Sequence, residues 1–282
     1  MNNLLPKLVL FTDLDGTLLD PITYSYEKAL SSIECLQQKG IPIIFCSAKT
    51  RAEQEVYHKK LEIYDPFIVE NGGAIFIPEG YFPFSFDYHK VRGTYQIIEL
   101  GRPYSEIRQI LGQIRAELGL NFRGFGDMSD EEVAMETGLD LEAAQRAKER
   151  EYDETVKLEG TTEEIGRVLK AIEKAGFNYA HGGRYYDVMG GNNKGQATTI
   201  LIDLFHKKLG QVETVGIGDS LNDLPMLSVV DIPILVQKPG GWWEEVDLPG
   251  ISRVKGVGPE AWSQAIKELI DSISTDKNRW LT

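Results

Sequence analysis

Short, mostly apolar runs alternate with amphipathic segments toward both ends of the chain. The apolar runs are bounded by turn or helix signals and predict strands at residues 8–12, 41–46, 66–69, 212–217 and 232–236. Helical periodicity predicts helices at residues 25–39, 50–61 and 259–273. Apolar strands separated by helices are typical of a parallel sheet covered on both faces. We therefore predict an α/β fold with a doubly wound, Rossmann-like parallel sheet.

The middle of the chain has a different pattern. It contains longer and more charged helical segments at residues 104–118 and 129–150, and alternating segments at residues 95–100 and 155–159. An aromatic and proline-rich segment, FIPEGYFPFSF, precedes this region, and the glycine-flanked segment GGRYYDVMGG ends it. These boundaries predict an α+β domain at 85–187, inserted into a first domain formed by 1–84 and 188–282. A single elaborated domain is the alternative.

Polar side chains follow the predicted strands or open a predicted helix. They are Asp13, Asp15, Ser47, Lys194, Asp219, Asn222 and Asp223. Because ligands bind at the carboxyl ends of the strands in an open parallel sheet, we expect these side chains to converge on one edge. Each of them alone is more often an ordinary loop, cap or surface residue. Their ordered combination indicates a functional site.

This set of side chains suits a hard cation and a phosphate group. Mg²⁺ prefers oxygen ligands, and a shared dication would allow Asp13 and Asp219 to stay ionised side by side. An ionised carboxylate can then attack phosphorus, and a second carboxylate can protonate the leaving alkoxide and activate water. Ser47 and Lys194 would hold the transferring phosphoryl oxygens. The predicted cofactor is therefore Mg²⁺.

Composition narrows the class of partner. The 282 residues carry a formal net charge of -13, which argues against nucleic acid as a partner. No apolar run is long enough to cross a membrane, and two cysteines, Cys35 and Cys46, are too few for a disulfide framework. We expect a cytoplasmic protein that acts on a small anionic sugar phosphate, away from membranes. Its oligomeric state is left open.

The four motifs resemble, in the same order, those of the haloacid dehalogenase-like phosphatase superfamily. They are DLDGT, Ser47 after an apolar strand, Lys194, and GDSLND. The resemblance implies that Asp13 is the nucleophile, that Asp15 is the acid and base, and that Ser47 and Lys194 hold the phosphoryl group. It also implies that the metal ligands are Asp13, Asp15, Asp219, Asn222 and Asp223. The inserted region resembles the large α/β cap of the sugar-phosphatase branch.

Finer segments narrow the resemblance to the mannosyl-3-phosphoglycerate phosphatase family. They are CSAKTRAE, VENGGAIF, LGRPYSEIR, REYDET and GGRYYDVMG. The implied reaction converts mannosyl- or glucosyl-3-phosphoglycerate to the glycosylglycerate, a compatible solute, and free phosphate. The implied substrate-binding residues of the cap are Arg150, Gly182, Gly183 and Arg184. Ala48, Thr155 and Asp187 depart from the family pattern of serine, proline and histidine, which leaves the identity of the sugar open.

Three other functions remain compatible with the sequence. One is hydrolysis of another sugar phosphate, and a second is phosphotransfer of the phosphohexomutase type, in which the aspartyl-phosphate returns its phosphoryl group to a sugar. The third is binding without catalysis on the same fold. The presence of Asp13, Asp15, Ser47, Lys194 and Asp219 together argues against the third, because binding alone does not need all five.

Overall fold

A computed structural model of the chain describes residues 7–182 and 184–279. The chain divides into two compact units, one made of Met1–Phe45 with Leu201–Thr282 and the other of Cys46–Ile200. Helix α7 (Lys194–Leu209) contains the point where the chain passes from the second unit back to the first. The boundaries predicted for an inserted domain, residues 85 and 187, fall inside the second unit and stay a prediction.

The first unit contains a five-stranded sheet in which every neighbouring pair is parallel. Its strands, in spatial order, are β13 (Ser252–Val257), β12 (Ile232–Gln237), β11 (Val212–Gly218), β1 (Lys7–Thr12) and β2 (Ile43–Phe45). Residues 8–12 of β1, which lies between β11 and β2, are all buried. The α/β fold with a parallel core sheet is thereby confirmed.

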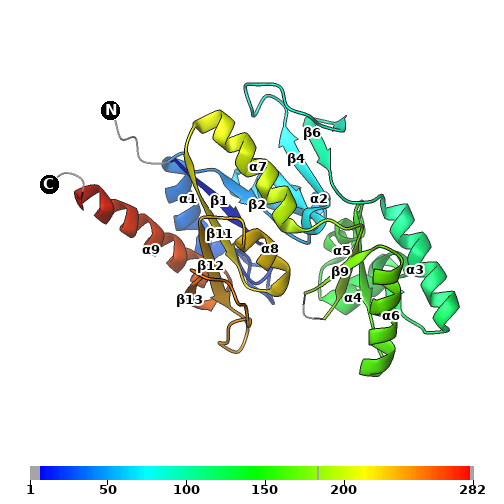
Figure 1. The fold of residues 1–282 in the computed structure, drawn as a ribbon. Coiled ribbons are helices and arrows are strands. Elements are labelled where there is room, and N and C mark those ends of the chain that lie inside the picture. The colour runs from blue at the N-terminus through cyan, green and yellow to red at the C-terminus, as the bar shows by residue number, and fades with distance from the viewer. Residues whose placement is uncertain (1–6, 183, 280–282) are drawn as a thin grey trace. The chain divides into compact units, whose positions relative to one another are not determined.

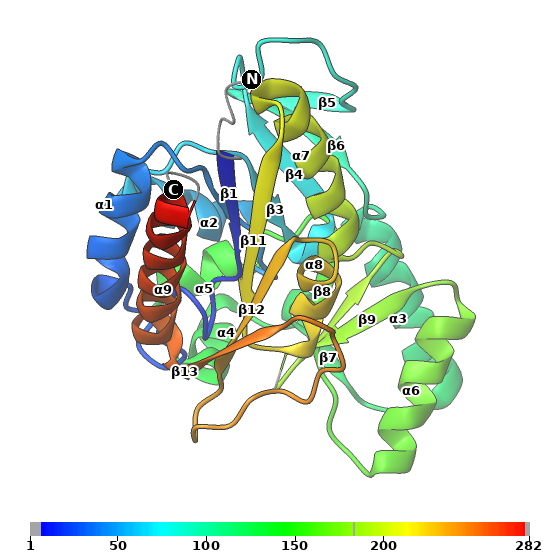
Figure 2. The same cartoon turned by 60° about the vertical axis from the view of Figure 1, so that its left-hand side comes forward.

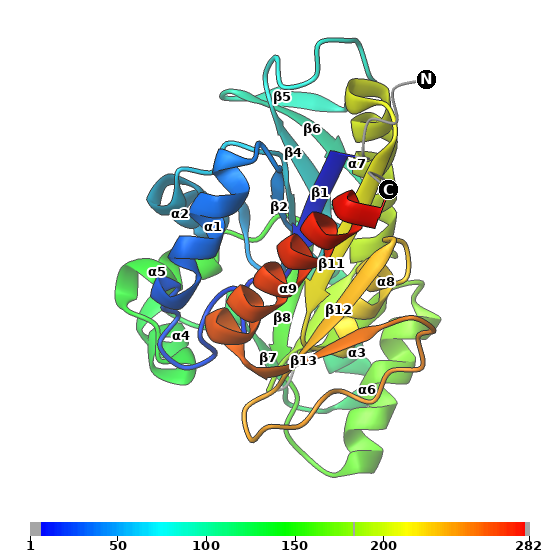
Figure 3. The same cartoon turned by 90° about the vertical axis from the view of Figure 1, so that its left-hand side faces the viewer.

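Helices cover both faces of this sheet. Helix α1 (Leu30–Gln38), which follows a 3₁₀ turn at Glu27–Ala29, lies beside α9 (Gly258–Arg279) on one face (Figures 2 and 3). The short helix α8 (Leu224–Leu227) lies on the other face against β11 and β12 (Figure 2). No helix in the described part of the chain is long and apolar enough to cross a bilayer.

The second unit contains two antiparallel four-stranded sheets. The first has the spatial order β3 (Phe67–Val69), β4 (Ala74–Pro78), β6 (Tyr95–Glu99) and β5 (Lys90–Arg92). The strand predicted at residues 66–69 thus exists. It pairs antiparallel with β4, and Ile68 also forms a single parallel bridge with Cys46. Helix α2 (Arg51–Leu61) starts at a capping box in which Thr50 and Glu53 satisfy each other's backbone amides, as the sequence TRAE favours.

The second of these sheets has the order β7 (Arg123–Gly124), β8 (Asp153–Lys157), β10 (Tyr186–Met189) and β9 (Asn178–His181). Helices α3 (Tyr104–Leu118) and α6 (Thr162–Lys174) lie side by side against it (Figure 1). Their apolar faces form one core with the sheet, which includes Ile107, Leu111, Val156, Val168, Ile172 and Val188.

The prediction of a single helix at residues 129–150 is wrong. The structure has two helices there, α4 (Asp130–Thr137) and α5 (Leu141–Ala147). Gly138 ends α4 in the left-handed conformation, with φ 79°, and the side chain of Asp140 accepts the backbone N–H of Ala143 to begin α5. Glycine and aspartate are ordinary stop and start signals for helices, and here they outweigh the continuous helical periodicity.

Candidate functional site

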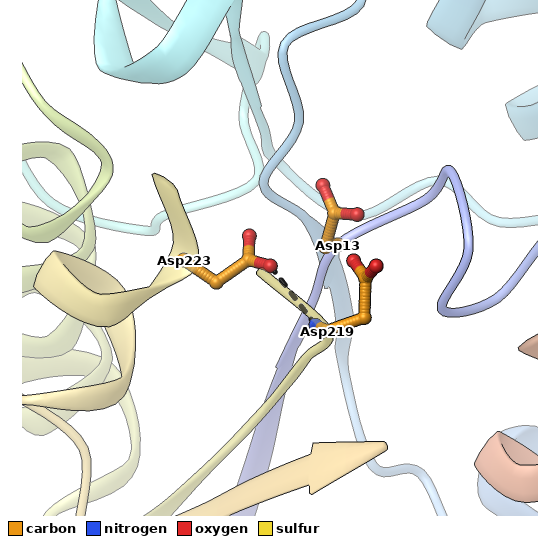
Figure 4. Close-up of side chains that lie close together, drawn as sticks. All are labelled: Asp13, Asp219 and Asp223. Atoms are coloured by element: carbon orange, nitrogen blue, oxygen red, sulfur yellow. Dashed lines mark hydrogen bonds between the residues drawn. The ribbon is translucent and has the colours of Figure 1, made fainter. Parts of the chain in front are cut away.

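Three buried aspartates of the first unit lie together at the carboxyl ends of two neighbouring strands. Asp13 directly follows β1, and Asp219 directly follows β11. Asp223 belongs to the 3₁₀ turn that comes next. One carboxylate oxygen from each lies within 4.8 Å of the others (Figure 4). Because Thr12 and Ile217 are partners in the parallel register, the two strand ends meet at the same edge of the sheet.

Asp223 is held by the turn that it terminates. Its Oδ2 accepts the backbone N–H groups of Asp219 and Ser220, each at 3.0 Å (Figure 4 draws the first). A Cβ atom on Gly218 would lie 2.5 Å from the Cβ of Asp223, so only glycine leaves room for this side chain. In the GDSLND segment the glycine therefore leaves the space that the last aspartate needs to accept these two backbone hydrogen bonds.

The DLDGT segment contacts the carboxylate of Asp219 through Gly16 and Thr17. The hydroxyl of Thr17 donates to Asp219 Oδ1 at 3.4 Å. Gly16 has φ 78°, and a Cβ there would lie 2.9 Å from Asp219 Oδ2. Glycine at this position therefore serves both the left-handed turn and the close approach of the carboxylate.

The backbone of Asp13 is held from two sides. Its N–H donates to the carbonyl of Ile217 at 2.9 Å. Its carbonyl accepts the hydroxyl of Thr12 at 2.8 Å, and that hydroxyl oxygen accepts the indole N–H of Trp262 at 3.0 Å. Thr12 and Trp262 are both completely buried. The indole N–H directs the hydroxyl proton toward the Asp13 carbonyl, since a hydroxyl has only one proton to donate.

The cluster fits a hard divalent cation. Carboxylates are oxygen ligands of the kind that Mg²⁺ prefers, and buried like charges at this range need a compensating positive charge. Of the other predicted ligands, Asp15 is exposed and lies outside the group of three. Asn222 is half-buried and its Oδ1 accepts the hydroxyl of Ser220 at 2.6 Å. Metal binding by Asp15 and Asn222 stays a prediction.

Ser47 and Lys194 both belong to the second unit. Ser47 is buried, and its Oγ accepts the backbone N–H of Lys49 at 3.2 Å. Lys194 opens α7 and is fully buried, and its carbonyl accepts the hydroxyl of Thr198 at 2.8 Å. Both are polar residues enclosed by the protein rather than surface residues. Their role as phosphoryl holders stays a prediction.

Two of the predicted substrate-binding residues lie between β9 and β10. Gly182 and Arg184 are both exposed there, and Arg184 Nη1 donates to the carbonyl of Glu136 at 3.3 Å. Gly183, which separates them, lies outside the described residues. The exposed guanidinium of Arg184 is accessible to an anionic ligand.

Arg150 has a different setting, because it is buried among carboxylates. Its guanidinium bonds Asp153, and Nη1 also donates to the carbonyl of Ala48 at 3.3 Å. Burial opposes the positive charge, but Asp153, Asp187 and Glu70 outweigh it and raise the pKa of Arg150. Burial also raises the pKa of Asp153 well above its ordinary value, although Arg150 opposes that shift. Arg150 is thus the central cation of a buried cluster, and direct binding of substrate by it stays a prediction.

The turn at Glu70–Gly73 is a feature to which the sequence pattern assigned no role. Glu70 and Asn71 are both buried and both left-handed, with φ 47° and 53°. Asn followed by Gly is a common left-handed turn signal, which the sequence does display. Nothing in the sequence indicates that Glu70 adopts this conformation, because glutamate rarely does.

Comparisons with known proteins identify the family of the chain. The family model for haloacid dehalogenase-like hydrolases matches residues 10–238. A protein of Methanococcoides burtonii named glucosyl-3-phosphoglycerate/mannosyl-3-phosphoglycerate phosphatase is 48% identical over 266 residues, covering 94% of this chain and 97% of its own. A protein of Pyrococcus furiosus named mannosyl-3-phosphoglycerate phosphatase is 44% identical over 231 residues, covering 81% and 90%.

The fold also matches solved structures. A crystal structure of a Thermoplasma acidophilum protein aligns with a TM-score of 0.67 at 19% sequence identity, covering 93% of this chain and 98% of that one. This likeness concerns the fold. The family match and the two relatives cover most of the chain, and the family match includes the segments that carry Asp13, Asp219 and Asp223. The chain belongs to the haloacid dehalogenase-like hydrolase family.

Proposed function

We propose that the protein is a Mg²⁺-dependent phosphatase that hydrolyses mannosyl- or glucosyl-3-phosphoglycerate to the glycosylglycerate and phosphate. The observation that carries the proposal is the buried cluster of Asp13, Asp219 and Asp223 at the carboxyl ends of β1 and β11. The names of the two relatives support the choice of substrate. A soluble cytoplasmic location and a small anionic sugar phosphate as the partner are parts of the same proposal.

Asp13, Asp219 and Asp223 would hold the metal ion, with Asn222 as a further ligand. Coordination by Asp15, also predicted from the sequence, has to leave free the carboxyl oxygen that carries its proton. When bound, Mg²⁺ neutralises the negative charge of the carboxylates and of the phosphate, which otherwise repel each other. Gly16 and Gly218 let the loops approach Asp219 and Asp223 closely, so the protein supplies a site without steric obstruction from its own side chains.

The proposed reaction has two steps. In the first, a carboxylate oxygen of Asp13 bonds to phosphorus, the bond between phosphorus and the ester oxygen breaks, and Asp15 gives its proton to the leaving alkoxide. In the second, Asp15 takes a proton from water, the water oxygen bonds to phosphorus, and the acyl phosphate bond breaks to release phosphate and the Asp13 carboxylate. The exposure of Asp15 supports this role, since it must exchange a proton with incoming water.

Ser47 and Lys194 are proposed to hold the phosphoryl oxygens, one by a hydrogen bond and one by its charge. Arg184 and the glycines beside it, Gly182 and Gly183, are proposed to bind the glycosylglycerate group together with Arg150. Arg184 is the strongest of these candidates, because its exposed guanidinium can pair with the glycerate carboxylate.

The experiment that tests the proposal is a phosphate-release assay with Mg²⁺ over a panel of substrates. The panel contains mannosyl- and glucosyl-3-phosphoglycerate, simple hexose phosphates and p-nitrophenyl phosphate. We expect the highest kcat/KM with a glycosyl-3-phosphoglycerate. A preference for a simple hexose phosphate would contradict the choice of substrate, and transfer of the phosphoryl group to a sugar instead of water would contradict the assignment as a phosphatase.

A further inference from the structure

The turn at Glu70–Gly73 combines unusual backbone geometry with complete burial. Among the non-glycine residues that the structure describes, Tyr24, Glu62, Glu70 and Asn71 have positive φ, and only the last two are adjacent. Left-handed residues with side chains cost free energy and persist where the surroundings determine them strongly. Both side chains are buried polar groups, so their contacts identify what holds the turn in place.

The side chain of Glu70 binds the chain just before and at the start of β8. Its carboxylate accepts the backbone N–H groups of Glu151, Tyr152 and Asp153, at distances of 2.6 to 3.1 Å. Three consecutive amides that converge on one buried carboxylate fix this segment relative to the turn. Glu70 therefore links the turn to the strand that carries Asp153 and Thr155.

The side chain of Asn71 binds β8 and β10 together. Its Nδ2 donates to Asp187 Oδ2 at 3.0 Å and to Asp153 Oδ2 at 3.4 Å. Asp187 also accepts the hydroxyl of Thr155 at 2.7 Å. Strand β10 begins two residues after Arg184. Asp187, which Asn71 contacts, is therefore only three residues from the proposed ligand-binding arginine.

The backbone of the same turn contacts the segments of both predicted phosphoryl holders. The N–H of Asn71 donates to the carbonyl of Ser47 at 3.1 Å. Asn192 Nδ2 donates to the carbonyls of Glu70 and Asn71 at 3.4 and 3.3 Å. A Cβ on Gly72 would lie 2.1 Å from the carbonyl oxygen of Asn193, the residue before Lys194. A shift of this turn must therefore displace the chain at Ser47, at Lys194, or at both.

We propose that Glu70 and Asn71 are positioning residues that couple the segments of Ser47 and Lys194 to strands β8 and β10. Phosphoryl transfer then depends on correct placement of these strands by the glycosylglycerate group. The proposal rests on the proposed function for the roles of Ser47 and Lys194. The coupling of these segments through the turn can also be measured without any enzyme activity.

The test uses Asn71→Asp, which keeps the size of the side chain and replaces its donor by a charge that Asp153 and Asp187 repel. We expect the ratio of kcat/KM for the glycosyl-3-phosphoglycerate to kcat/KM for p-nitrophenyl phosphate to fall about tenfold or more, with most of the loss in kcat. Asn121→Asp, the same change at an exposed site, should leave the ratio unchanged. A purely structural role for Asn71 would lower both activities equally.

Exchange of the amide and the carboxylate between positions 71 and 187 tests whether the lost ratio can be rescued. In the double variant Asn71→Asp/Asp187→Asn, the new amide at position 187 can donate to position 71 and still accept the hydroxyl of Thr155. We expect it to recover part of the lost ratio, because Asp153 still faces the new carboxylate at position 71. Failure to recover would contradict the coupling through this contact. If Asn71→Asp does not fold, Thr155→Val, which removes one hydroxyl from Asp187, should lower the ratio in the same direction.

Hydrogen exchange separates this proposal from the proposed function, because it needs no activity. In Asn71→Asp we expect faster amide exchange in peptides that cover residues 46–50, 151–157 and 190–196, compared with Asn121→Asp. Faster exchange confined to residues 70–73 would overturn the coupling even if the enzyme is active. Absence of phosphatase activity in the unmodified protein would overturn the proposed function and leave the exchange result to decide the coupling.

Discussion

At the scale of single residues, the carboxylates themselves were predictable and their supports were not. Asp13, Asp219 and Asp223 are recognisable in the sequence because each follows an apolar strand in a motif of small and acidic residues. Trp262 lies in the final helix, more than two hundred residues from Thr12, and only the fold brings its indole to that hydroxyl. Arg150 was predicted to bind substrate, but its side chain is buried among carboxylates whose positions depend on four separate segments. These carboxylates are Glu53, Glu70, Asp153 and Asp187.

The hydrogen bonds from Trp262 through Thr12 to Asp13 predict a coupled effect on stability. Thr12→Val keeps the shape and leaves the indole N–H buried without its acceptor, so we expect the free energy of unfolding to fall by about 1–3 kcal/mol. Trp262→Phe leaves the Thr12 hydroxyl without its donor and should also destabilise. The double variant should cost less than the sum of the two, as measured by urea denaturation. Additive effects would show that the indole and the hydroxyl do not act as a pair.

His58 predicts a dependence of stability on pH. Burial lowers the pKa of His58 to about 4, although its bond to the Ile63 carbonyl opposes the shift. Between the ordinary value of about 6.5 and this value, the unfolded chain binds a proton that the native protein does not. Stability is therefore present above about pH 6.5 and is lost as pH falls toward 4, by up to about 3 kcal/mol from this residue.

The variant His58→Gln isolates this contribution. Urea denaturation at about pH 7.5 and about pH 4.5 should show a smaller acid-induced loss in His58→Gln than in the unmodified protein, by about 2–3 kcal/mol. His206→Gln, a change at an exposed histidine, is the matched control and should behave as the unmodified protein does. An equal loss in all three proteins would assign the acid sensitivity to other groups.

At the scale of elements, apolar periodicity identified strands β1, β2, β11 and β12 of the parallel sheet and helices α1, α2, α3 and α9, because burial leaves a direct mark on the sequence. The edge strand β13 and helix α6 were not predicted. Periodicity also failed where short polar signals decide the structure. The segment at residues 129–150 reads as one helix, but Gly138 and Asp140 divide it. The strand at residues 66–69 was recognisable from its apolar run, whereas its antiparallel partner β4 follows from the turn at Glu70–Gly73.

The close contact of Gly218 with Asp223 predicts that the loop after β11 tolerates no side chain there. Gly218→Ala places a Cβ 2.5 Å from that of Asp223, so it should displace the aspartate, destabilise the protein and weaken metal-dependent activity. Gly112→Ala in α3 has no atom within 4 Å of the added Cβ and should stabilise that helix by about 0.5–1 kcal/mol. Thermal denaturation and phosphate release measure both effects. Full activity in Gly218→Ala would contradict the need for close packing at this loop.

At the scale of the whole molecule, a chain with a net charge of -13 concentrates buried negative charge at one place in its first unit. Binding of Mg²⁺ there should stabilise the native state by an amount that grows with the ratio of free ion to Kd, about 2.7 kcal/mol at a hundredfold ratio. We expect Mg²⁺ to raise the thermal unfolding midpoint by several degrees relative to EDTA at equal ionic strength. Asp219→Asn should remove most of this increase. An equal increase in both proteins would mean that the ion binds elsewhere.

The central claim is that Asp13 is the nucleophile of a phosphatase, and one measurement tests it most directly. It is phosphate release from mannosyl-3-phosphoglycerate with saturating Mg²⁺, compared between the unmodified protein and Asp13→Asn. Asp203→Asn, at an exposed position of α7, controls for the loss of one charge, and circular dichroism confirms folding. We predict that Asp13→Asn loses at least about a thousandfold in kcat while Asp203→Asn stays near the unmodified rate. Turnover by a folded Asp13→Asn within about tenfold of the unmodified protein would contradict the account.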